Sequence, residues 1–387
     1  MTDDDQLRRR ARSPHPTTRA AVGTALAATV GAVAMCLGAP HSDAVPRPTP
    51  TPSAPAPTVP AEPAPETGMQ PPSTDPQFAG RVSLMTQSRV GVLQASTIVA
   101  RLLGIPTGAN VPTPEQDSDP GRPPTTNAEG VVMTMSKYRG WNVWQMAPQD
   151  GPASAPPIAT RPTRKTIIAV HGGAYVEPPT PAHWAYYASL VRETGATVEI
   201  PLYPGALIAH AAGVIPNMAD YFSAQIREHG AENVSVLGDS AGAAITLAAT
   251  QELVRRGQPV PASLVLVSPW LDATMTDTAP APYFDPFLNV DTLRTTGKMW
   301  AGNLSTRDPR VSPLFGSLAG LPPTYVYSGS VDLLYKDAFA LSRKAAQTPG
   351  ARIWFDMRWG GTHNWAINPM LAEGTTMAPM ISRQLLG

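Results

Sequence analysis

The amino-acid sequence predicts an α/β fold in which a mainly parallel sheet is covered by helices on both faces. From residue 166 onwards, short β-rich runs alternate with longer segments of helical apolar spacing. Two of these runs lead directly into glycine-containing turns, at 171–175 and 238–242. Ligands bind beyond the carboxyl ends of the strands in such sheets, so we expect the chemistry in these turns.

The expected elements cover most of the chain after residue 84. A helix is expected at 85–103, and two short strands at 131–136 and 141–146. The later strands are expected at 166–170, 196–200, 234–237, 264–267, 324–327 and 353–357. Helices are expected between most of them, at 181–193, 215–228, 241–256, 291–301 and 336–346.

Composition narrows the classes of function. The chain has 387 residues, with 29 basic and 29 acidic side chains and no formal net charge. Because a neutral chain lacks the basic field that gathers nucleic acid, we expect no nucleic-acid partner. The single cysteine, Cys36, leaves no disulfide framework and no zinc cluster of thiolates.

The N-terminal 44 residues resemble an export signal. Five arginines between Arg8 and Arg19 precede an uncharged stretch at 20–39, and small residues at Ser42 and Ala44 suit cleavage after Ala44. We expect an exported or cell-envelope-associated protein. An uncleaved membrane anchor and a cytoplasmic tail are the alternatives.

Residues 45–78 are expected to form a linker outside any folded domain. Prolines recur there among Thr, Ala and Ser, a composition that favours an extended polyproline II spacer. Its hydroxyl side chains would be glycosylated or unmodified in an exported protein. Globular composition begins at about Gln77, and we expect one catalytic domain at 79–387 with a small lid.

The motif GDSAG at 238–242 stands between an expected strand and an alanine-rich helix. This context fits the G-x-S-x-G nucleophile elbow, whose turn is too tight for side chains at the glycines and which presents the serine hydroxyl. We therefore expect Ser240 to be the nucleophile. The N–H of Ala241, at the helix N-terminus, can donate to a developing oxyanion.

The motif HGGAY at 171–175 follows the expected strand 166–170. An acyl-transfer site needs at least two N–H donors about 3 Å from the substrate carbonyl oxygen, and this turn can supply them. We expect an oxyanion hole around Gly172, Gly173, Ala174 and Ala241, with Gly173 and Ala174 as this loop's donors. We expect a structural role for His171, because in folds with this elbow the base follows the serine.

His363 is the only histidine after Ser240 and is expected to be the general base. The acid should lie between them on a loop after a strand, and Asp332 follows the strand 324–327 by a few residues. Asp337 is the alternative, but it falls in the next helix, where we expect a solvated surface carboxylate. These roles predict ester hydrolysis through an acyl-enzyme, with no metal or organic cofactor.

Five separated motifs carry a family resemblance: HGGAY, GDSAG, Ser268-Pro269-Trp270, Asp332 and His363. With these in order, the chain from about Gly80 resembles the hormone-sensitive-lipase-like esterases, which include bacterial acetyl-hydrolases. The resemblance implies an α/β-hydrolase fold with an eight-stranded, mostly parallel sheet, a cap from about 79–110 and 272–315, and short to medium acyl esters as substrates. It carries the triad to Ser240, Asp332 and His363, and the oxyanion donors to Gly173, Ala174 and Ala241.

The sequence departs from the family pattern at several places. Ala174 and Ala243 stand where many relatives have glycine, although neither change removes a backbone N–H. Leu333 follows the acid where many members place proline, and Asn364 follows the histidine. We expect Asp239, beside the nucleophile, to bond local backbone.

The substrate is weakly specified by the sequence. The segment 276–286 is expected to form a lid or pocket edge. Nine aromatic residues are candidates for the pocket and otherwise for the core: Trp184, Tyr186, Tyr187, Tyr203, Tyr283, Phe284, Phe287, Trp300 and Trp365. Amide or peptide hydrolysis by the same chemistry, and a non-catalytic binding protein on a hydrolase scaffold, are the alternative functions.

Overall fold

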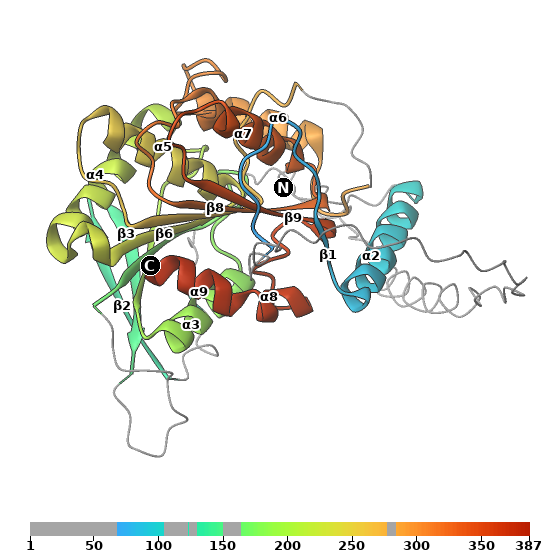
Figure 1. Cartoon of the computed structure of the whole chain (residues 1–387), viewed down its shortest axis with the longest axis horizontal. Coiled ribbons are helices and arrows are strands. Elements are labelled where there is room, and N and C mark those ends of the chain that lie inside the picture. The colour runs from blue at the N-terminus through green and yellow to red at the C-terminus, as the bar shows by residue number, and fades with distance from the viewer. Residues whose placement is uncertain (1–67, 104–122, 124–129, 150–163, 277–283) are drawn as a thin grey trace, which may run out of the picture. The chain divides into compact units, whose positions relative to one another are not determined.

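The structure, a computed structural model, describes residues 68–103, 123, 130–149, 164–276 and 284–387. Its strands are β1 (Gly80–Arg81), β2 (Val131–Tyr138), β3 (Trp141–Pro148), β4 (Thr166–Val170), β5 (Thr197–Leu202), β6 (Val234–Asp239), β7 (Ser263–Val267), β8 (Thr324–Val331) and β9 (Ile353–Thr362). They form one nine-stranded sheet in the order β1-β9-β8-β7-β6-β4-β5-β3-β2. In Figure 1, β1 and β9 lie toward one side of the sheet and β2 and β3 toward the other.

The sheet is mainly parallel, as predicted. Neighbouring strands pair in parallel along the sheet order from β1 to β5. At the far edge, β3 pairs antiparallel with both β5 and β2, so β3 alone runs against the other strands. The expectation of eight strands is wrong by one. The two-residue strand β1 adds a ninth, because the chain before the first helix pairs with Arg358 and Trp359 of β9.

The described helices are α2 (Leu84–Leu102), α3 (Pro181–Thr194), α4 (Ala211–His229), α5 (Ala241–Arg255), α6 (Val290–Ala301), α7 (Tyr335–Ala346), α8 (Ala372–Thr376) and α9 (Ala378–Leu386). Two 3₁₀ turns, η3 (Ala231–Asn233) and η4 (Pro313–Phe315), accompany them. The sequence did not predict α8 and α9, because they have only 5 and 9 residues and contain a glycine and a proline that indicate a turn.

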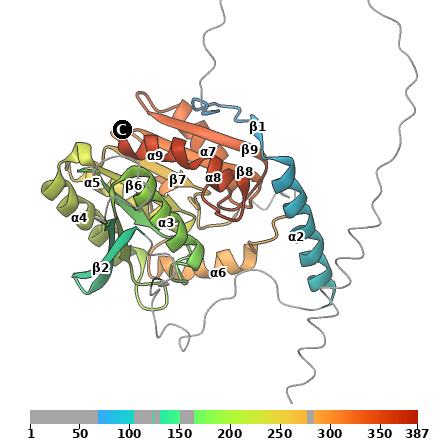
Figure 2. The ribbon, with the colours of Figure 1, turned by 90° about the horizontal axis from the view of Figure 1, so that it is seen from below.

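Helices cover the sheet on both faces (Figures 1 and 2). The helices α3 and α9 pack on one face, and α4, α5 and α7 pack on the other. Side chains of β4 alternate between two cores, with Ile168 and Val170 in one and Ile167 and Ala169 in the other. Burial of each such branched side chain contributes about 2 kcal/mol relative to exposure, so the carboxyl end of β4 is held firmly from both sides.

The folded domain begins earlier than expected. Gln70, in the predicted linker 45–78, exchanges two backbone hydrogen bonds with Phe355 of β9, at 2.8 and 2.9 Å. Met69 is buried, and the ring of Phe78 packs against Phe339. The residues from Gly68 onwards are therefore part of the folded domain, since they extend the edge of the sheet. The signal-like segment 1–44 lies outside the described residues.

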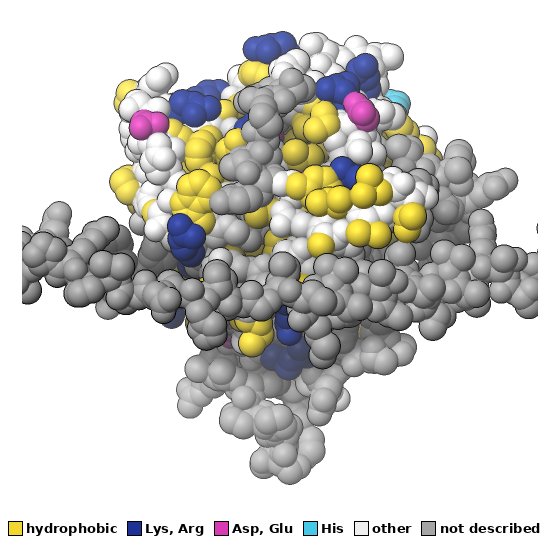
Figure 3. All heavy atoms as spheres, turned by 90° about the vertical axis from the view of Figure 1, so that its right-hand side faces the viewer, with side chains coloured by type: hydrophobic (Ala, Val, Ile, Leu, Met, Phe, Trp, Pro, Cys, Tyr) yellow, Lys and Arg dark blue, Asp and Glu magenta, His cyan; other side chains and the backbone are white. Residues whose placement is uncertain are grey.

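The two parts of the expected cap, 79–110 and 272–315, are in contact where the structure describes them. Gln94 of α2 donates to the carbonyl of Phe284, and the Arg101 guanidinium lies 4.4 Å from the centre of the Phe284 ring. Figure 3 looks onto the side of the domain that carries α2, where hydrophobic side chains gather. Leu84 and Leu102 of α2 are strongly exposed.

Most of the expected lid segment 276–286, including Tyr283, lies outside the described residues. Among the helices that the structure describes, none has the length and hydropathy needed to cross a membrane.

Candidate active site

Ser240 lies in a strained turn between β6 and α5. Its backbone angles, φ 52° and ψ −120°, belong to a region that side-chain-bearing residues rarely adopt. A Cβ at Gly238 would lie 2.7 Å from the carbonyl oxygen of Gly242, and a Cβ at Gly242 would collide with the carbonyl of Val170 at the end of β4. Both glycines are therefore required by close backbone approach, as the elbow motif predicts.

Neighbouring backbone fixes this turn from the side of β7. The N–H of Ser240 donates to the carbonyl of Val267 at 2.9 Å, and the N–H of Trp270 donates to the carbonyl of Ser240 at 3.2 Å. The position of the serine is thus determined by main-chain hydrogen bonds on both of its sides. Ser240 borders a cavity that opens at the carboxyl ends of the strands.

The loop after β4 presents Gly173 and Ala174 to the same cavity. Both have positive φ, 116° and 50°. Within the described part of the chain, the N–H groups of Gly173, Ala174 and Ala241 donate to no protein acceptor. Free N–H groups beside a serine hydroxyl are what an oxyanion hole requires.

Gly172 does not fit the oxyanion role expected for it. Its N–H donates to Oδ1 of Asp239 at 3.0 Å, so this donor is already engaged. A Cβ at Gly172 would lie 3.0 Å from the Cβ of Ser240. Gly172 therefore permits close approach of the loop to Ser240, and its own N–H is not free to donate to a ligand.

His171 is buried and held in one tautomer. Its Nδ1 donates to the carbonyl of Gly172 at 2.7 Å, and its ring stacks on Tyr203 with centroids 4.5 Å apart. Burial lowers the pKa of His171 to about 4, so the imidazole is neutral at physiological pH. The Tyr203 hydroxyl donates to the carbonyl of His171 at 2.8 Å. These contacts favour the expected structural role.

Asp332 and His363 are brought together from two adjacent strands. A register shift between Gly329 and Val331 at the end of β8 precedes Asp332, and such irregularities re-aim side chains. Oδ2 of Asp332 lies 3.2 Å from Nδ1 of His363, while Oδ1 accepts the N–H of Leu334 at 2.9 Å. Asp332 is fully buried. Because Nδ1 faces the carboxylate, Nε2 is the ring nitrogen that remains for proton transfer.

The charge on this side of the cavity favours a basic imidazole. Burial by itself would lower the pKa of His363, but the charge of Asp332, the hydrogen bond to it, and the more distant charges of Asp285 and Asp239 together raise that pKa above its usual value. A raised pKa suits a group that must accept a proton from a hydroxyl.

Asp337, the alternative acid, serves another purpose. It lies in α7, and its Oδ2 accepts the N–H groups of Leu271 and Asp272 at 2.6 and 2.9 Å. The expectation of a solvated surface carboxylate is wrong, since burial raises the pKa of Asp337 to about 8. Asp332, not Asp337, contacts His363.

Two side chains from other segments hold the histidine loop. The N–H of Asn364 donates to Oγ of Ser268 at 2.9 Å, and Nδ2 of Asn364 donates to Oδ2 of Asp239 at 2.7 Å. Asn364 itself has φ 57°, a conformation that asparagine tolerates better than most residues. The Ser-Pro-Trp motif thus acts through its serine, on the backbone beside the expected base.

Asp239 connects three segments, which corrects the expectation that it bonds local backbone. Besides Gly172 and Asn364, it binds Nε2 of His183 in α3 at 3.1 Å. Nδ1 of His183 accepts a hydrogen bond from the N–H of Thr180, so Nε2 carries the hydrogen and donates to Asp239. Although burial opposes ionisation, His183, Gly172 and Asn364 hold the pKa of Asp239 below its usual value. No short sequence motif indicates His183 or its hydrogen bond to Asp239.

Asp285 is a second carboxylate behind the acid. Its Oδ2 accepts the N–H of Leu333 at 2.8 Å, and its Oδ1 accepts the N–H groups of Phe287 and Leu288 at 2.8 and 3.0 Å. Burial, then the nearby charge of Asp332, raises the pKa of Asp285 to about 6. The described end of the expected lid segment is therefore tied to the loop that carries Asp332.

The cavity beside Ser240 has a volume of about 380 Å³. Ser240 and His363 both border it, together with Gly173, Ala174 and Glu177. Its apolar wall comes from later segments: Phe287, Leu288, Leu293 and Ile367. Of the nine aromatic candidates, Tyr186 and Phe287 line this cavity, while Trp184, Tyr187, Trp300 and Trp365 are fully buried in the core.

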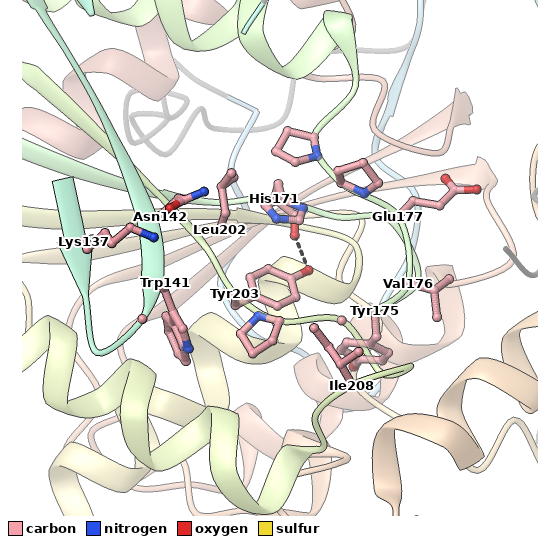
Figure 4. Close-up of a pocket in the computed structure, with 15 residues that line it drawn as sticks. Lys137, Trp141, Asn142, His171, Tyr175, Val176, Glu177, Leu202, Tyr203 and Ile208 are labelled. Atoms are coloured by element: carbon pink, nitrogen blue, oxygen red, sulfur yellow. Dashed lines mark hydrogen bonds between the residues drawn. The ribbon is translucent and has the colours of Figure 1, made fainter. Parts of the chain in front are cut away.

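A second cavity of about 250 Å³ lies on the other side of the oxyanion loop. Figure 4 shows the His171 and Tyr203 rings inside it, with Asn142 and Lys137 to one side. Glu177 also borders this cavity, but in Figure 4 its carboxylate points away from the other residues. In the described ranges, no cluster of His, Cys, Asp or Glu has the arrangement of a metal site.

Comparison with known proteins agrees with this geometry. The family model for the alpha/beta hydrolase fold matches residues 167–367. The chain is 41% identical over 265 residues to a triacylglycerol lipase of Mycobacterium tuberculosis, covering 68% of this chain and 53% of that protein. It is 32% identical over 222 residues to an acetyl-hydrolase of Streptomyces hygroscopicus, covering 55% of this chain and 74% of that protein. The chain thus spans only about half the length of the mycobacterial lipase.

Solved structures share the fold. A hormone-sensitive lipase from a metagenome library superposes with a TM-score of 0.64 at 20% identity, covering 80% of this chain and 99% of that one. An esterase of the bacterial hormone-sensitive lipase family superposes with a TM-score of 0.62 at 22% identity, covering 79% and 98%. The chain therefore belongs to the α/β-hydrolase family, as its resemblance to hormone-sensitive-lipase-like esterases implied.

Proposed function

We propose that this chain is a carboxylic ester hydrolase that acts through an acyl-enzyme on Ser240. One observation carries the proposal: Ser240 and His363 border one cavity beside the free N–H groups of Gly173 and Ala174, and Asp332 holds Nδ1 of that histidine. The names of the relatives, which include lipase, esterase and acetyl-hydrolase, support the same class of reaction.

The proposed reaction begins with attack of the Ser240 hydroxyl on the ester carbonyl, while Nε2 of His363 takes the hydroxyl proton. The N–H groups of Gly173, Ala174 and Ala241 hold the oxyanion. His363 then protonates the leaving alcohol, and water repeats these steps on the acyl-enzyme. Asp332 keeps the imidazole in the reactive tautomer and stabilises its charged form.

We propose short to medium acyl chains as substrates. A cavity of about 380 Å³ lies toward the small end of ligand pockets, and its apolar wall suits a hydrocarbon chain. Faster cleavage of long-chain triacylglycerol than of acetyl or butyryl esters would overturn this preference.

The test is a series of p-nitrophenyl esters of graded chain length, with wild type and Ser240→Ala. The variant should lose at least about 10⁴-fold in kcat with an unchanged circular dichroism spectrum, because the nucleophile is removed without disturbing the elbow. Near-native rates in the variant would refute the nucleophile assignment. A p-nitroanilide of the same acyl group tests the alternative, amide hydrolysis, which we expect to be much slower.

We also propose export or cell-envelope association, on the basis of the arginine-rich and apolar pattern at 1–44. N-terminal sequencing of protein recovered from culture medium and from envelope fractions tests this. A terminus after Ala44 is expected, and an intact Met1 or Thr2 terminus would exclude cleavage.

A further inference from the structure

Glu177 has a carboxylate without a partner at the edge of the active-site cavity. It is half-buried and borders the cavity that holds Ser240 and His363. Its own N–H donates to the carbonyl of Gly173 at 2.8 Å, so its backbone belongs to the oxyanion loop. Among the described residues, no donor or cation pairs with its carboxylate, and burial alone raises its pKa.

The other charged groups of this cavity are engaged. His183 pairs with Asp239, and His363 pairs with Asp332. A half-buried carboxylate is normally hydrogen-bonded, because desolvation without compensation is unfavourable. Glu177 therefore stands out as a group whose partner would come from a ligand.

The chemistry of the cavity restricts which half of an ester could supply that partner. A plain acyl chain carries no hydrogen-bond donor and suits the apolar wall formed by Phe287, Leu288 and Ile367. The donor must then belong to the alcohol half. A cationic alcohol is disfavoured because a full positive charge loses far more on desolvation beside this apolar wall than a neutral hydroxyl does.

We propose that Glu177 accepts a hydrogen bond from a free hydroxyl on the alcohol half of the substrate, so that partial esters of polyols are the preferred substrate class. The inference rests on the proposed ester hydrolysis. It makes Glu177 a specificity-determining residue placed by the same turn that positions the oxyanion donors.

The experiment compares two butyrate esters that differ only in the alcohol, n-propyl butyrate and 2,3-dihydroxypropyl butyrate, in a pH-stat. The readout is the ratio of their kcat/KM values. Wild type should favour the dihydroxypropyl ester by about tenfold or more, since a charged acceptor distinguishes a hydroxyl strongly. Glu177→Leu should bring the ratio close to one. Glu177→Gln should retain part of the preference, because its amide oxygen still accepts.

Glu193→Gln is the matched control. Glu193 is a partly buried carboxylate at the end of α3 whose pKa is also raised by burial, and it does not border the cavity. Its ratio should equal that of wild type. The choline ester of butyrate adds a cationic alcohol without a hydroxyl, and wild type should not prefer it over n-propyl butyrate.

Three results would overturn the inference while leaving ester hydrolysis intact: an equal rate for both esters in wild type, a preference that persists in folded Glu177→Leu, or a Glu177-dependent preference for the choline ester. If wild type hydrolyses propyl butyrate and Ser240→Ala abolishes that activity, the proposed function is supported whatever the ratio of the two esters is. Absence of any ester hydrolysis by wild type would overturn both.

Discussion

The two halves of the candidate active site are held by different means. On the nucleophile side, backbone sterics and main-chain hydrogen bonds position Ser240, with Gly238 and Gly242 filling places where no Cβ fits. On the base side, His363 is positioned by side chains from distant segments, including Asp332 and, through its neighbour Asn364, Ser268.

This difference explains how visible each half is in the sequence. Backbone sterics act within a few residues, so they leave a short motif of glycines around the serine. A side-chain network leaves no motif of fixed spacing, because its members meet only after the strands have paired. Asp239 connects the two halves, since it binds both Gly172 of the oxyanion loop and Asn364 beside the base.

The largest effect should come from Asp332→Asn on the base side. An amide in this place favours the wrong tautomer of His363 and stabilises its charged form poorly, so kcat should fall by about 10⁴-fold. The matched control is Asp291→Asn, since the Asp291 side chain is 88% exposed in α6. Loss of less than tenfold in Asp332→Asn, measured with p-nitrophenyl butyrate, would show that the base side does not depend on this carboxylate.

On the nucleophile side, Gly242→Ala should act mainly on stability. The added methyl group would collide with the carbonyls of Val170 and His171, and we expect a loss of about 3 kcal/mol in the free energy of unfolding. Gly213→Ala is the control, because no atom lies within 4 Å of that Cβ position in α4. There the substitution should stabilise the protein by about 0.5 kcal/mol. Similar urea midpoints for both variants would contradict the steric account.

Substitutions of Asn364 distinguish the effect of its backbone conformation from the effect of its side-chain hydrogen bond to Asp239. Asn364→Gly tolerates the positive φ and loses only the side-chain hydrogen bond to Asp239. Asn364→Ala loses the same hydrogen bond and also strains the backbone at this φ. We expect kcat to fall about tenfold in each, and the alanine variant to be less stable by a further 1 kcal/mol or so, about the cost of left-handed backbone. Unchanged kcat in the glycine variant would show that this linkage between the halves is dispensable.

The smallest effect should be a shift in pH dependence. His363 acts as a base only when neutral, and its raised pKa places the acid limb of kcat/KM above pH 6.5. Asp285→Asn removes one anion that raises this pKa, so the limb should move to lower pH. The raised pKa also contributes stability that is fully present below about pH 6.5 and is lost as pH rises through the folded pKa. That loss should be smaller in the variant.

If Asp285→Asn lowered kcat without moving the acid limb, this carboxylate would act only by anchoring the loop that carries Asp332. The measurement is a pH–rate profile for both proteins, accompanied by melting temperatures across the same pH range.

The fold was largely predictable, for reasons visible in particular elements. Strands such as β4 and β7 are continuous apolar runs between turns, and α5 follows its strand without interruption. The expectation was wrong at the margins, where β1 and the segment from Gly68 onwards join the sheet edge by backbone pairing. Such pairing depends on an available strand edge rather than on side-chain pattern, so composition alone indicated a linker.

Sequence by itself determined the alternation of elements, the elbow around Ser240 and the chain order that singles out Asp332 and His363. Those features depend on local sterics and on periodicity, which neighbouring residues express. Only the tertiary structure decided that Gly172 donates to Asp239, that Asp337 anchors a loop, and that His183, Asn364 and Asp285 surround the site. These contacts join residues that lie far apart along the chain, and they exist because parallel strands bring their carboxyl ends to one edge.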